Sequence, residues 1–237
     1  METVLTWYPA GLTMPAHAHE ADQHSLILAG AVVEETGSRK TEITAGAAGF
    51  KAAGLSHGDV YGPHGALILS LNRPHRARPS APWLWRRADA GQVRRLAALT
   101  LQGGPASSDA LTDCAARLEM NEKGDPARDA APIWLLQVRE AIDADPAAAR
   151  LDGLAAAAGV HRVHLSRRFA ATFGTAFSLY RRRAMVAAAV RAMAENRAPA
   201  SAAALEAGFC DQAHFARVLK SETGATPARL GALLRAA

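Results

Sequence analysis

The C-terminal half of the chain carries one sequence pattern twice. The first copy is LAAAAGVHRVHLSRRFAATFGTAF (residues 154–177), and the second is AALEAGFCDQAHFARVLKSETGATP (residues 203–227). Each copy has an alanine-rich segment of high helix propensity, a glycine, and a second segment with apolar residues at helical spacing. The glycines, Gly159 and Gly208, stand where a tight turn between two helices needs a permissive backbone. The repeat therefore predicts two helix-turn-helix units.

In each second helix, apolar and polar residues separate onto different faces. Leu165 and Phe169 share one face of the first copy, and Phe215 and Leu219 share the corresponding face of the second. The outward stripes consist of Arg162, Val163, Ser166 and Arg167 in the first copy and Gln212, Ala213, Ala216 and Arg217 in the second. Arginine suits the edge of guanine, and glutamine suits the edge of adenine. We therefore expect one face to pack on its own domain and the other to enter a major groove.

Between the copies, SLYRRRAMVAAAVRAMAE (residues 178–195) predicts one long helix. About 18 residues at 1.5 Å each span ~27 Å, which is close to the ~34 Å of one DNA turn. Such a spacer would hold two recognition helices about one turn of DNA apart. Arg181, with Arg182 and Arg183 beside it, is a candidate phosphate contact, and Lys220 is a further candidate DNA contact.

Basic charge is concentrated in the same part of the chain. The net charge is +5, yet residues 1–130 contain 13 Lys and Arg against 14 Asp and Glu, whereas residues 131–237 contain 14 against 8. This asymmetry is typical of a nucleic-acid-binding domain. Two cysteines form no disulfide framework, and we find neither a signal peptide nor an apolar run of about 20 residues. We therefore expect a cytoplasmic protein with no membrane segment.

The repeat resembles the DNA-binding domain of the AraC/XylS family of transcription regulators. The matching pattern is LA…AGV..HLSR.F…FG..F..Y, then a helix, then GF.DQ.HF.R..K…G.TP, within residues 131–237. The resemblance implies two subdomains that read adjacent segments of double-stranded DNA, with recognition helices at residues 161–173 and 211–222. Two positions depart from the pattern, because Ala203 replaces a larger aliphatic residue and Leu219 replaces a phenylalanine.

The N-terminal part has a different texture. Short β-type runs (HSLILA, AVVEE, TEITA, GFKAA and ALILSL) alternate with glycines up to about residue 75, which favours a small all-β sandwich or barrel. This part is similar to the cupin-type sensor domain of the same family. We expect an α+β protein with a cupin-like β-barrel over residues 1–80, a helical segment over 81–120, a linker over 121–131 and a double helix-turn-helix domain over 132–237.

Four histidines of the N-terminal part are candidate metal ligands. His17 and His19 are two residues apart, which would put both on one face of a strand, while His24 begins the next β-type run and Gly30 closes it. The cupin resemblance implies a second motif at AAGLSHGD, which keeps His57. Four imidazoles converging in a barrel would suit Zn²⁺ or another divalent ion. Alternatively, these histidines only line a ligand pocket or hydrogen-bond across strands.

The segment between the two parts predicts two helices, at residues 91–101 and 107–120. Val93, Leu96 and Leu99 form an apolar stripe on the first of them. The stripe would serve either packing within the domain or a dimer interface. The family resemblance implies the dimer, so we expect a homodimer.

Three functions are compatible with these features. The first is a DNA-binding transcription regulator controlled by a small effector or a metal ion in the barrel. The alternative is a metal-dependent cupin enzyme fused to a DNA-binding domain, although Glu20, Asp22 and Asp59 are the only acids near the histidine motif. A DNA-repair alkyl acceptor is disfavoured, because Cys114 and Cys210 lack the flanking motif. We therefore predict a regulator that is not an enzyme.

Overall fold

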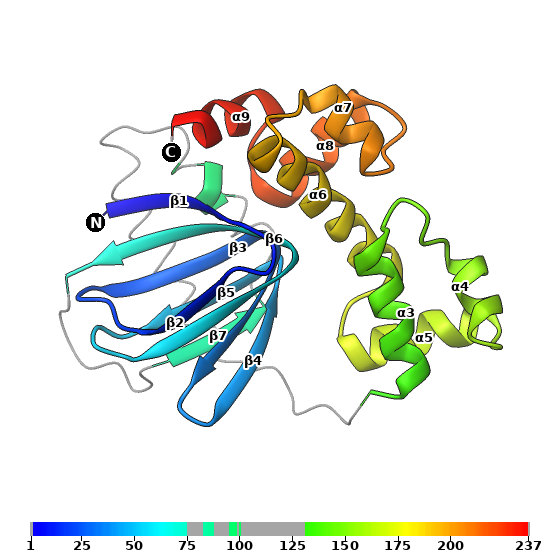
Figure 1. Cartoon of the computed structure of the whole chain (residues 1–237), viewed down its shortest axis with the longest axis horizontal. Coiled ribbons are helices and arrows are strands. Elements are labelled where there is room, and N and C mark those ends of the chain that lie inside the picture. The colour runs from blue at the N-terminus through cyan, green and yellow to red at the C-terminus, as the bar shows by residue number, and fades with distance from the viewer. Residues whose placement is uncertain (1, 75–82, 88–94, 99, 101–130, 237) are drawn as a thin grey trace.

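The computed structural model describes residues 2–74, 83–87, 95–98, 100 and 131–236. Within these residues, an antiparallel sheet comes first along the chain, and the part from residue 131 onward is helical (Figure 1). The expected α+β fold class is confirmed. None of the described helices is long and apolar enough to cross a membrane.

Seven strands of the described residues form one sheet in the order β1-β6-β3-β5-β7, with β2 beside β6 and β4 beside β3. The strands are β1 (Glu2–Tyr8), β2 (Thr13–His17), β3 (Asp22–Thr36), β4 (Arg39–Thr44), β5 (Ala47–Lys51), β6 (His57–Arg73) and β7 (Trp83–Arg87). The two longest strands, β3 and β6, each change partner along their length. β3 pairs first with β5 and then with β4, while β6 pairs first with β2 and then with β1. The sheet therefore bends around a small interior.

The bend lies where two glycines meet. The ladder between β3 and β6 shifts register near Gly30, and both Gly30 and Gly65 have positive φ angles, +78° and +68°. A Cβ atom on Gly30 would lie 1.9 Å from the carbonyl oxygen of Gly65. Only glycine permits this approach. The expectation that Gly30 closes a strand is therefore wrong, because Gly30 lies inside β3 and bends it.

Both faces of the central strands are buried. Ile27 faces the interior of the bent sheet with Val32 and Tyr61. Leu26 and Leu28 belong to a second core, which the sheet shares with the helices. Because successive side chains of a strand point to opposite faces, burial on both sides produces a continuous apolar run such as HSLILA instead of an alternating one.

The segment predicted to be helical over residues 81–120 is only partly so. Trp83–Arg87 forms strand β7, which pairs with β5, so the sheet extends past the expected boundary at residue 80. Residues 95–98 and 100 are helical, and Leu96 is fully buried in the core that includes Leu26 and Leu28. The predicted helix at 107–120 and the linker at 121–130 lie outside the described residues, as do Val93 and Leu99.

The helical part consists of two groups of helices joined by one long helix. The helices are α3 (Ile133–Ala144), α4 (Leu151–Ala157), α5 (Arg162–Phe173), α6 (Phe177–Glu195), α7 (Ala200–Glu206), α8 (Gln212–Thr223) and α9 (Pro227–Ala236). Figure 1 shows α3, α4 and α5 at one end of α6 and α7, α8 and α9 at the other. The predicted spacer helix is confirmed, because α6 has 19 residues, or about 28 Å.

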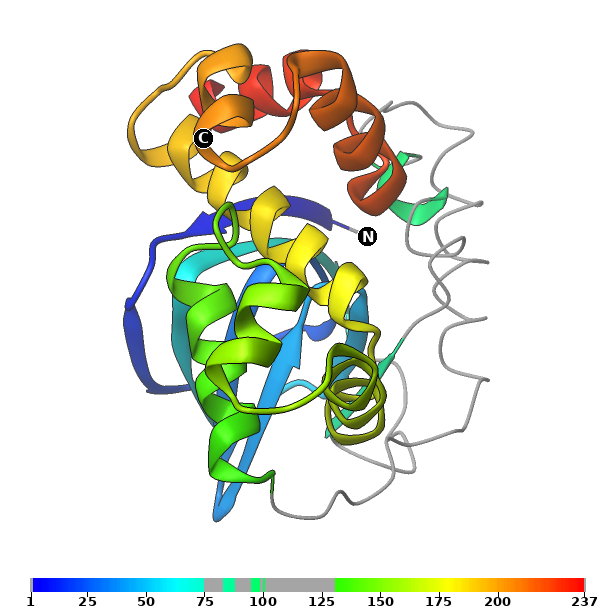
Figure 2. The same ribbon diagram turned by 90° about the vertical axis from the view of Figure 1, so that its right-hand side faces the viewer.

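The sheet packs directly against the helical part, and α6 crosses the contact (Figure 2). Met185, Val186 and Val190 of α6 share one buried cluster with the leucines of β3 and β6. Polar contacts flank this apolar core. Arg139 of α3 pairs with Glu42 of β4 at 2.7 Å. The two parts of the chain therefore have a common core as well as a covalent connection.

Candidate functional site

Each helix-turn-helix unit begins with a short helix and a left-handed glycine. α4 leads through Gly159 (φ +65°) to α5, and α7 leads through Gly208 (φ +90°) to α8. The side chain of His161 accepts a hydrogen bond from the amide of Val163, and Asp211 Oδ1 accepts one from the amide of His214 at 2.6 Å. These bonds satisfy amides that a helix start would leave unpaired. The predicted turns and recognition helices are therefore present, with bounds that differ by one residue.

Helix α5 divides into a buried face and an exposed face. Leu165 and Phe169 are fully buried in the core of the first unit. Arg162, Val163 and Arg167 are exposed, and Ser166 is half-buried at the edge of the stripe. Arg162 forms a long ion pair with Asp152 at 3.4 Å, both at the surface. Such a pair contributes little energy, so the guanidinium is available to another anion.

Helix α8 repeats this division. Phe215 and Leu219 are fully buried. Exposed residues are Gln212, Ala213, Arg217 and Lys220, while Ala216 is half-buried. Leu219 packs in the buried cluster although the family pattern has a phenylalanine there. The second stripe is therefore open to a partner in the same way as the first.

The arginines at the start of α6 serve packing between helices. Arg181 donates a hydrogen bond to the carbonyl oxygen of Ala147 at 3.0 Å. Arg182 and Arg183 both bond to Glu222 of α8, at 3.3 and 3.1 Å. These contacts tie α6 to the loop before α4 and to the second recognition helix. They do not favour Arg181 as a phosphate contact, and that role stays a prediction.

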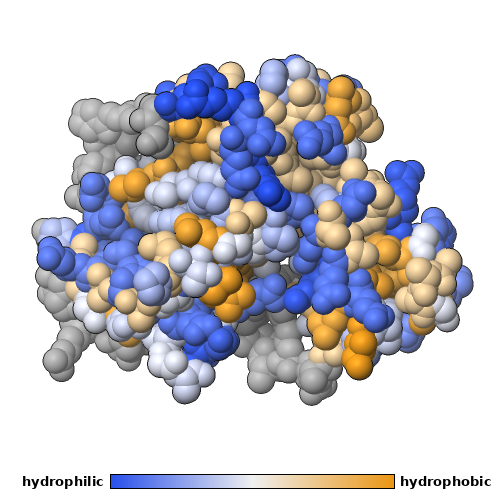
Figure 3. Space-filling view, in the orientation of Figure 1, coloured by the Kyte–Doolittle hydropathy of each residue, from blue (hydrophilic) through white to orange (hydrophobic). Residues whose placement is uncertain are grey.

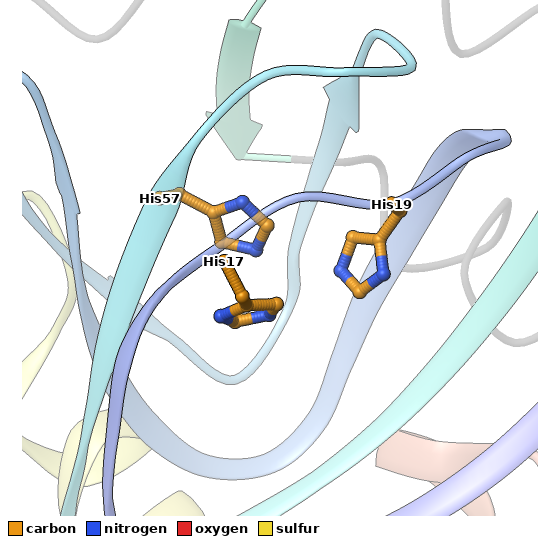
Figure 4. Close-up of side chains that lie close together, drawn as sticks. All are labelled: His17, His19 and His57. Atoms are coloured by element: carbon orange, nitrogen blue, oxygen red, sulfur yellow. The ribbon is translucent and has the colours of Figure 1, made fainter.

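Three of the four predicted metal ligands come together in the interior of the sheet (Figure 4). The ring centroids of His17 and His57 are 4.4 Å apart, and the ring of His19 lies 5.0 Å from the first and 5.1 Å from the second. Ligand atoms of all three lie within 4.8 Å of one another. His17 ends β2, His19 follows it, and His57 begins β6, so the pairing of β2 with β6 creates the cluster.

Backbone carbonyls set the tautomer of two of these rings. His17 Nδ1 lies 2.9 Å from the carbonyl oxygen of Pro15, and His57 Nδ1 lies 3.2 Å from that of Leu55. A ring nitrogen that faces a carbonyl must carry the proton, so Nε2 of each ring keeps its lone pair. Metal-binding histidines commonly have this arrangement. The donor set of the three imidazoles therefore suits Zn²⁺.

A buried lysine also occupies this pocket. Lys51 Nζ lies 3.0 Å from His57 Nε2 and 2.8 Å from Glu34 Oε2. Trp85 Nε1 donates to the other oxygen of Glu34 at 2.6 Å. Lys51 is 7% exposed, and Glu34 and His57 are each 1% exposed. Burial, and then the charge of Lys51, lower the pKa of His57 to about 4, so its ring is neutral and its Nε2 accepts from the ammonium.

His24 does not belong to the cluster, so its assignment as the fourth ligand is wrong. Its neighbours Gln23 and Ser25 line the cavity of about 50 Å³ that holds the three histidines. His24 therefore points to the opposite face of β3, where its ring lies 4.9 Å from that of Phe50. Arg73 Nη2 also approaches its Nε2, at 3.5 Å.

Sequence reasoning missed the two charged residues of the pocket, Lys51 and Glu34. A signal for both was present, because each is a charged residue inside an apolar β-type run, GFKAA and AVVEE. Glu34 is two residues beyond Val32, which faces the interior, so the pleat turns Glu34 inward as well. Of the acids named from the sequence, Asp59 lines the pocket, and burial raises its pKa.

A second cavity, of about 80 Å³, lies between the sheet and the helices. Figure 3 shows the surface hollowed where the two parts meet. Asp143 of α3 is half-buried at its wall, and desolvation raises the pKa of this carboxyl to about 6. The hydroxyl of Tyr180 donates to the two oxygens of Asp143, at 2.9 and 3.0 Å. This cavity separates the two parts next to their shared core.

Sequence comparison identifies the helical part. Residues 154–232 match the family of helix-turn-helix domains. The match begins inside α4 and ends inside α9, so it includes both of the units described above. The chain thus contains a helix-turn-helix domain, and this domain is of the AraC/XylS type. The predicted resemblance is confirmed, and the domain supports the class of DNA-binding transcription regulators.

Several solved structures are similar to the chain. ToxT from Vibrio cholerae O395 is 10% identical over 100% of this chain and 98% of its own, with a TM-score of 0.44. The C-terminal domain of AraT, a response regulator from Geobacillus stearothermophilus, is 19% identical over 44% of this chain and 88% of its own, with a TM-score of 0.41. KdgF from a Halomonas species is 27% identical over 31% of this chain and 68% of its own, with a TM-score of 0.29. No curated protein matches the chain.

Proposed function

We propose that the chain is a transcription regulator whose helices α5 and α8 enter adjacent major grooves of double-stranded DNA. The main observation in support of this proposal is that α5 and α8 each have one buried apolar face and one exposed polar face. Each buries two large apolar side chains in its own unit and exposes a stripe with an arginine at the same position, Arg167 or Arg217. Packing alone does not require that stripe, whereas readout of base edges does.

The bases are read by the two outward stripes. In α5 these residues are Arg162, Val163, Ser166 and Arg167, and in α8 they are Gln212, Ala213, Ala216 and Arg217. Lys220 contacts phosphate. Helix α6 sets the distance between the two helices, and its bonds to Glu222 orient α8 on it.

The sheet domain acts as the sensor of this regulator. Its polar pocket receives a small organic effector, and its outer face rests on α6. A ligand that alters the bent sheet therefore acts on the helix that spaces the two recognition helices. The regulator works as a homodimer, which gives two copies of the double unit for one operator.

Selection from a random double-stranded DNA library, followed by fluorescence anisotropy with the selected sequence, tests the proposal on the full chain. Arg167→Ala and Arg217→Ala should each weaken binding about 10-fold or more, since a bidentate contact from arginine to guanine contributes about 1–3 kcal/mol. Affinity should fall steeply as salt rises, because phosphate contacts release counterions.

Arg168→Ala is the matched control for Arg167→Ala. Both arginines are exposed on α5, but Arg168 is about 100° away from Arg167 around the helix and lies off the stripe. We expect Arg168→Ala to change affinity less than about 3-fold. Equal losses for the two variants, or no enrichment of any DNA at low salt, would contradict the proposal.

A further inference from the structure

We propose that Lys51 is the resident cation of the histidine pocket, and that it excludes divalent metal ions from the three imidazoles. One part of this inference rests on the proposed function, namely that the sheet domain is a sensor and responds to an organic effector. The occupancy of the pocket itself is a property of the sheet domain, and it is measured without DNA.

The position of Lys51 is the first argument. Two groups of donor atoms in the sheet could hold a cation, one formed by His17, His19 and His57 and the other by Glu34, His57 and Asp59. The two groups share His57. The Lys51 ammonium bonds to the shared ring at Nε2 and to Glu34 of the second group. It is thus already bonded to donors that a metal ion would need.

The electron pair of His57 Nε2 is the second argument. Nδ1 of this ring is committed to the Leu55 carbonyl as a donor, so Nε2 is the nitrogen that could bind a metal. One lone pair cannot serve both an ammonium hydrogen and a metal ion. A metal ion could therefore take all three imidazoles only if Lys51 left its present position.

Charge balance is the third argument. Lys51 and Glu34 are buried and pair with each other at 2.8 Å, so the pocket carries a compensated pair of charges. A divalent ion beside the buried ammonium would add strong repulsion, because charges interact strongly where water is excluded. Withdrawal of Lys51 would break its buried ion pair with Glu34. The intact pocket is therefore a poor metal site, although its histidines have suitable tautomers.

The same argument predicts what removal of the ammonium does. In Lys51→Met the side chain keeps a similar length without charge, His57 Nε2 is released, and the Glu34 carboxylate loses the ammonium with which it pairs. Zn²⁺ can bind to both groups, because it binds imidazole nitrogen and carboxylate oxygen. We expect the variant to gain a metal site that the natural chain keeps closed.

Calorimetric titration of the chelator-treated full chain with Zn²⁺ tests the proposal. We expect weak or undetectable binding to the natural chain and one Zn²⁺ per chain in Lys51→Met, with an affinity at least 10-fold higher. Lys51→Arg keeps the charge and should bind no better than the natural chain. The double variant Lys51→Met/His57→Ala should lose the gain, which ties it to the pocket.

Tight one-to-one binding of Zn²⁺ by the natural chain, equal to that of Lys51→Met, would overturn the proposal. So would a gain in Lys51→Met that survives His57→Ala. Circular dichroism checks that each variant is folded. Should Lys51→Met fail to fold, Lys51→Gln provides the same comparison, and submicromolar binding of one Zn²⁺ to the natural chain overturns the proposal by itself. Because no titration contains DNA, failure here is distinct from failure of the DNA-binding proposal.

Discussion

At the scale of single residues, Gly30 and Gly37 show that a position can require glycine for two different physical reasons. Both have positive φ angles, +78° and +60°. A Cβ on Gly30 would meet the backbone of Gly65, whereas no described atom lies within 4 Å of a Cβ on Gly37. Conformation therefore explains the glycine in the β3–β4 turn, and close approach of two strands adds a second requirement at the bend.

This difference predicts unequal costs for the same substitution. Gly37→Ala should lower the free energy of unfolding by about 1–2 kcal/mol, the cost of a left-handed conformation for a residue with a Cβ. Gly30→Ala should cost about 3 kcal/mol or more, because the backbone of Gly65 must also move. Equilibrium unfolding in urea measures both. Equal losses would show that the approach of β3 to β6 is not a constraint.

At the scale of elements, the recognition helices depend on their first turns. Asp211 precedes α8 and binds the amide of His214 at 2.6 Å. Its negative charge also suits the positive end of the helix dipole. His161 has the equivalent place before α5, with a longer bond of 3.3 Å to the amide of Val163. The second recognition helix therefore has the stronger N-terminal cap.

Removal of this cap has a defined cost. Asp211→Ala should lower the free energy of unfolding by about 1 kcal/mol. Asp211→Asn keeps a side-chain oxygen that can accept the hydrogen bond, so it should lower this free energy by only about a few tenths of a kcal/mol, the contribution of the charge. Urea unfolding again gives the values. If Asp211→Asn were as unstable as Asp211→Ala, the side-chain hydrogen bond would not be the stabilising interaction.

At the scale of the whole molecule, the sheet and the helices share one core. Leu28 of β3 is 2% exposed and lies in the same cluster as Met185 and Val190 of α6. The Arg139–Glu42 ion pair and the hydrogen bond from Arg191 to the carbonyl of Pro63 add polar contacts across the same boundary. Neither part can unfold without exposing apolar surface of the other.

We therefore predict a single cooperative transition for both parts. Tryptophan fluorescence, which includes Trp7 and Trp85 of the sheet, should change at the same urea concentration as helical circular dichroism. Leu28→Ala should lower the stability reported by both signals by about 2–4 kcal/mol, although the substitution lies in the sheet. Loss of the fluorescence transition alone, with the helical signal unchanged, would contradict a shared core.

Local patterns predicted the helical part well. The turn glycines, the buried pairs Leu165 and Phe169 or Phe215 and Leu219, and the spacer helix all follow from residues a few positions apart. An α-helix satisfies its backbone hydrogen bonds within the segment and repeats every 3.6 residues, so its faces can be read from spacing. A strand through His17 and His19 was expected, but β2 ends at His17. Strand β1 was not predicted, because its pairing depends on β6, which lies more than 50 residues away in the chain.

The contacts within the histidine pocket could not be predicted from the spacing of residues in the sequence. His17 and His57 meet because β2 pairs with β6, and Lys51 reaches them from β5; none of these contacts is local in the chain. His24 was misplaced for a related reason, since one step along a strand moves a side chain to the opposite face. Short-range periodicity thus predicted the helix-turn-helix architecture from residue types alone. Strand pairing, which joins distant segments, determined which charged groups share the interior and placed an ammonium among the histidines.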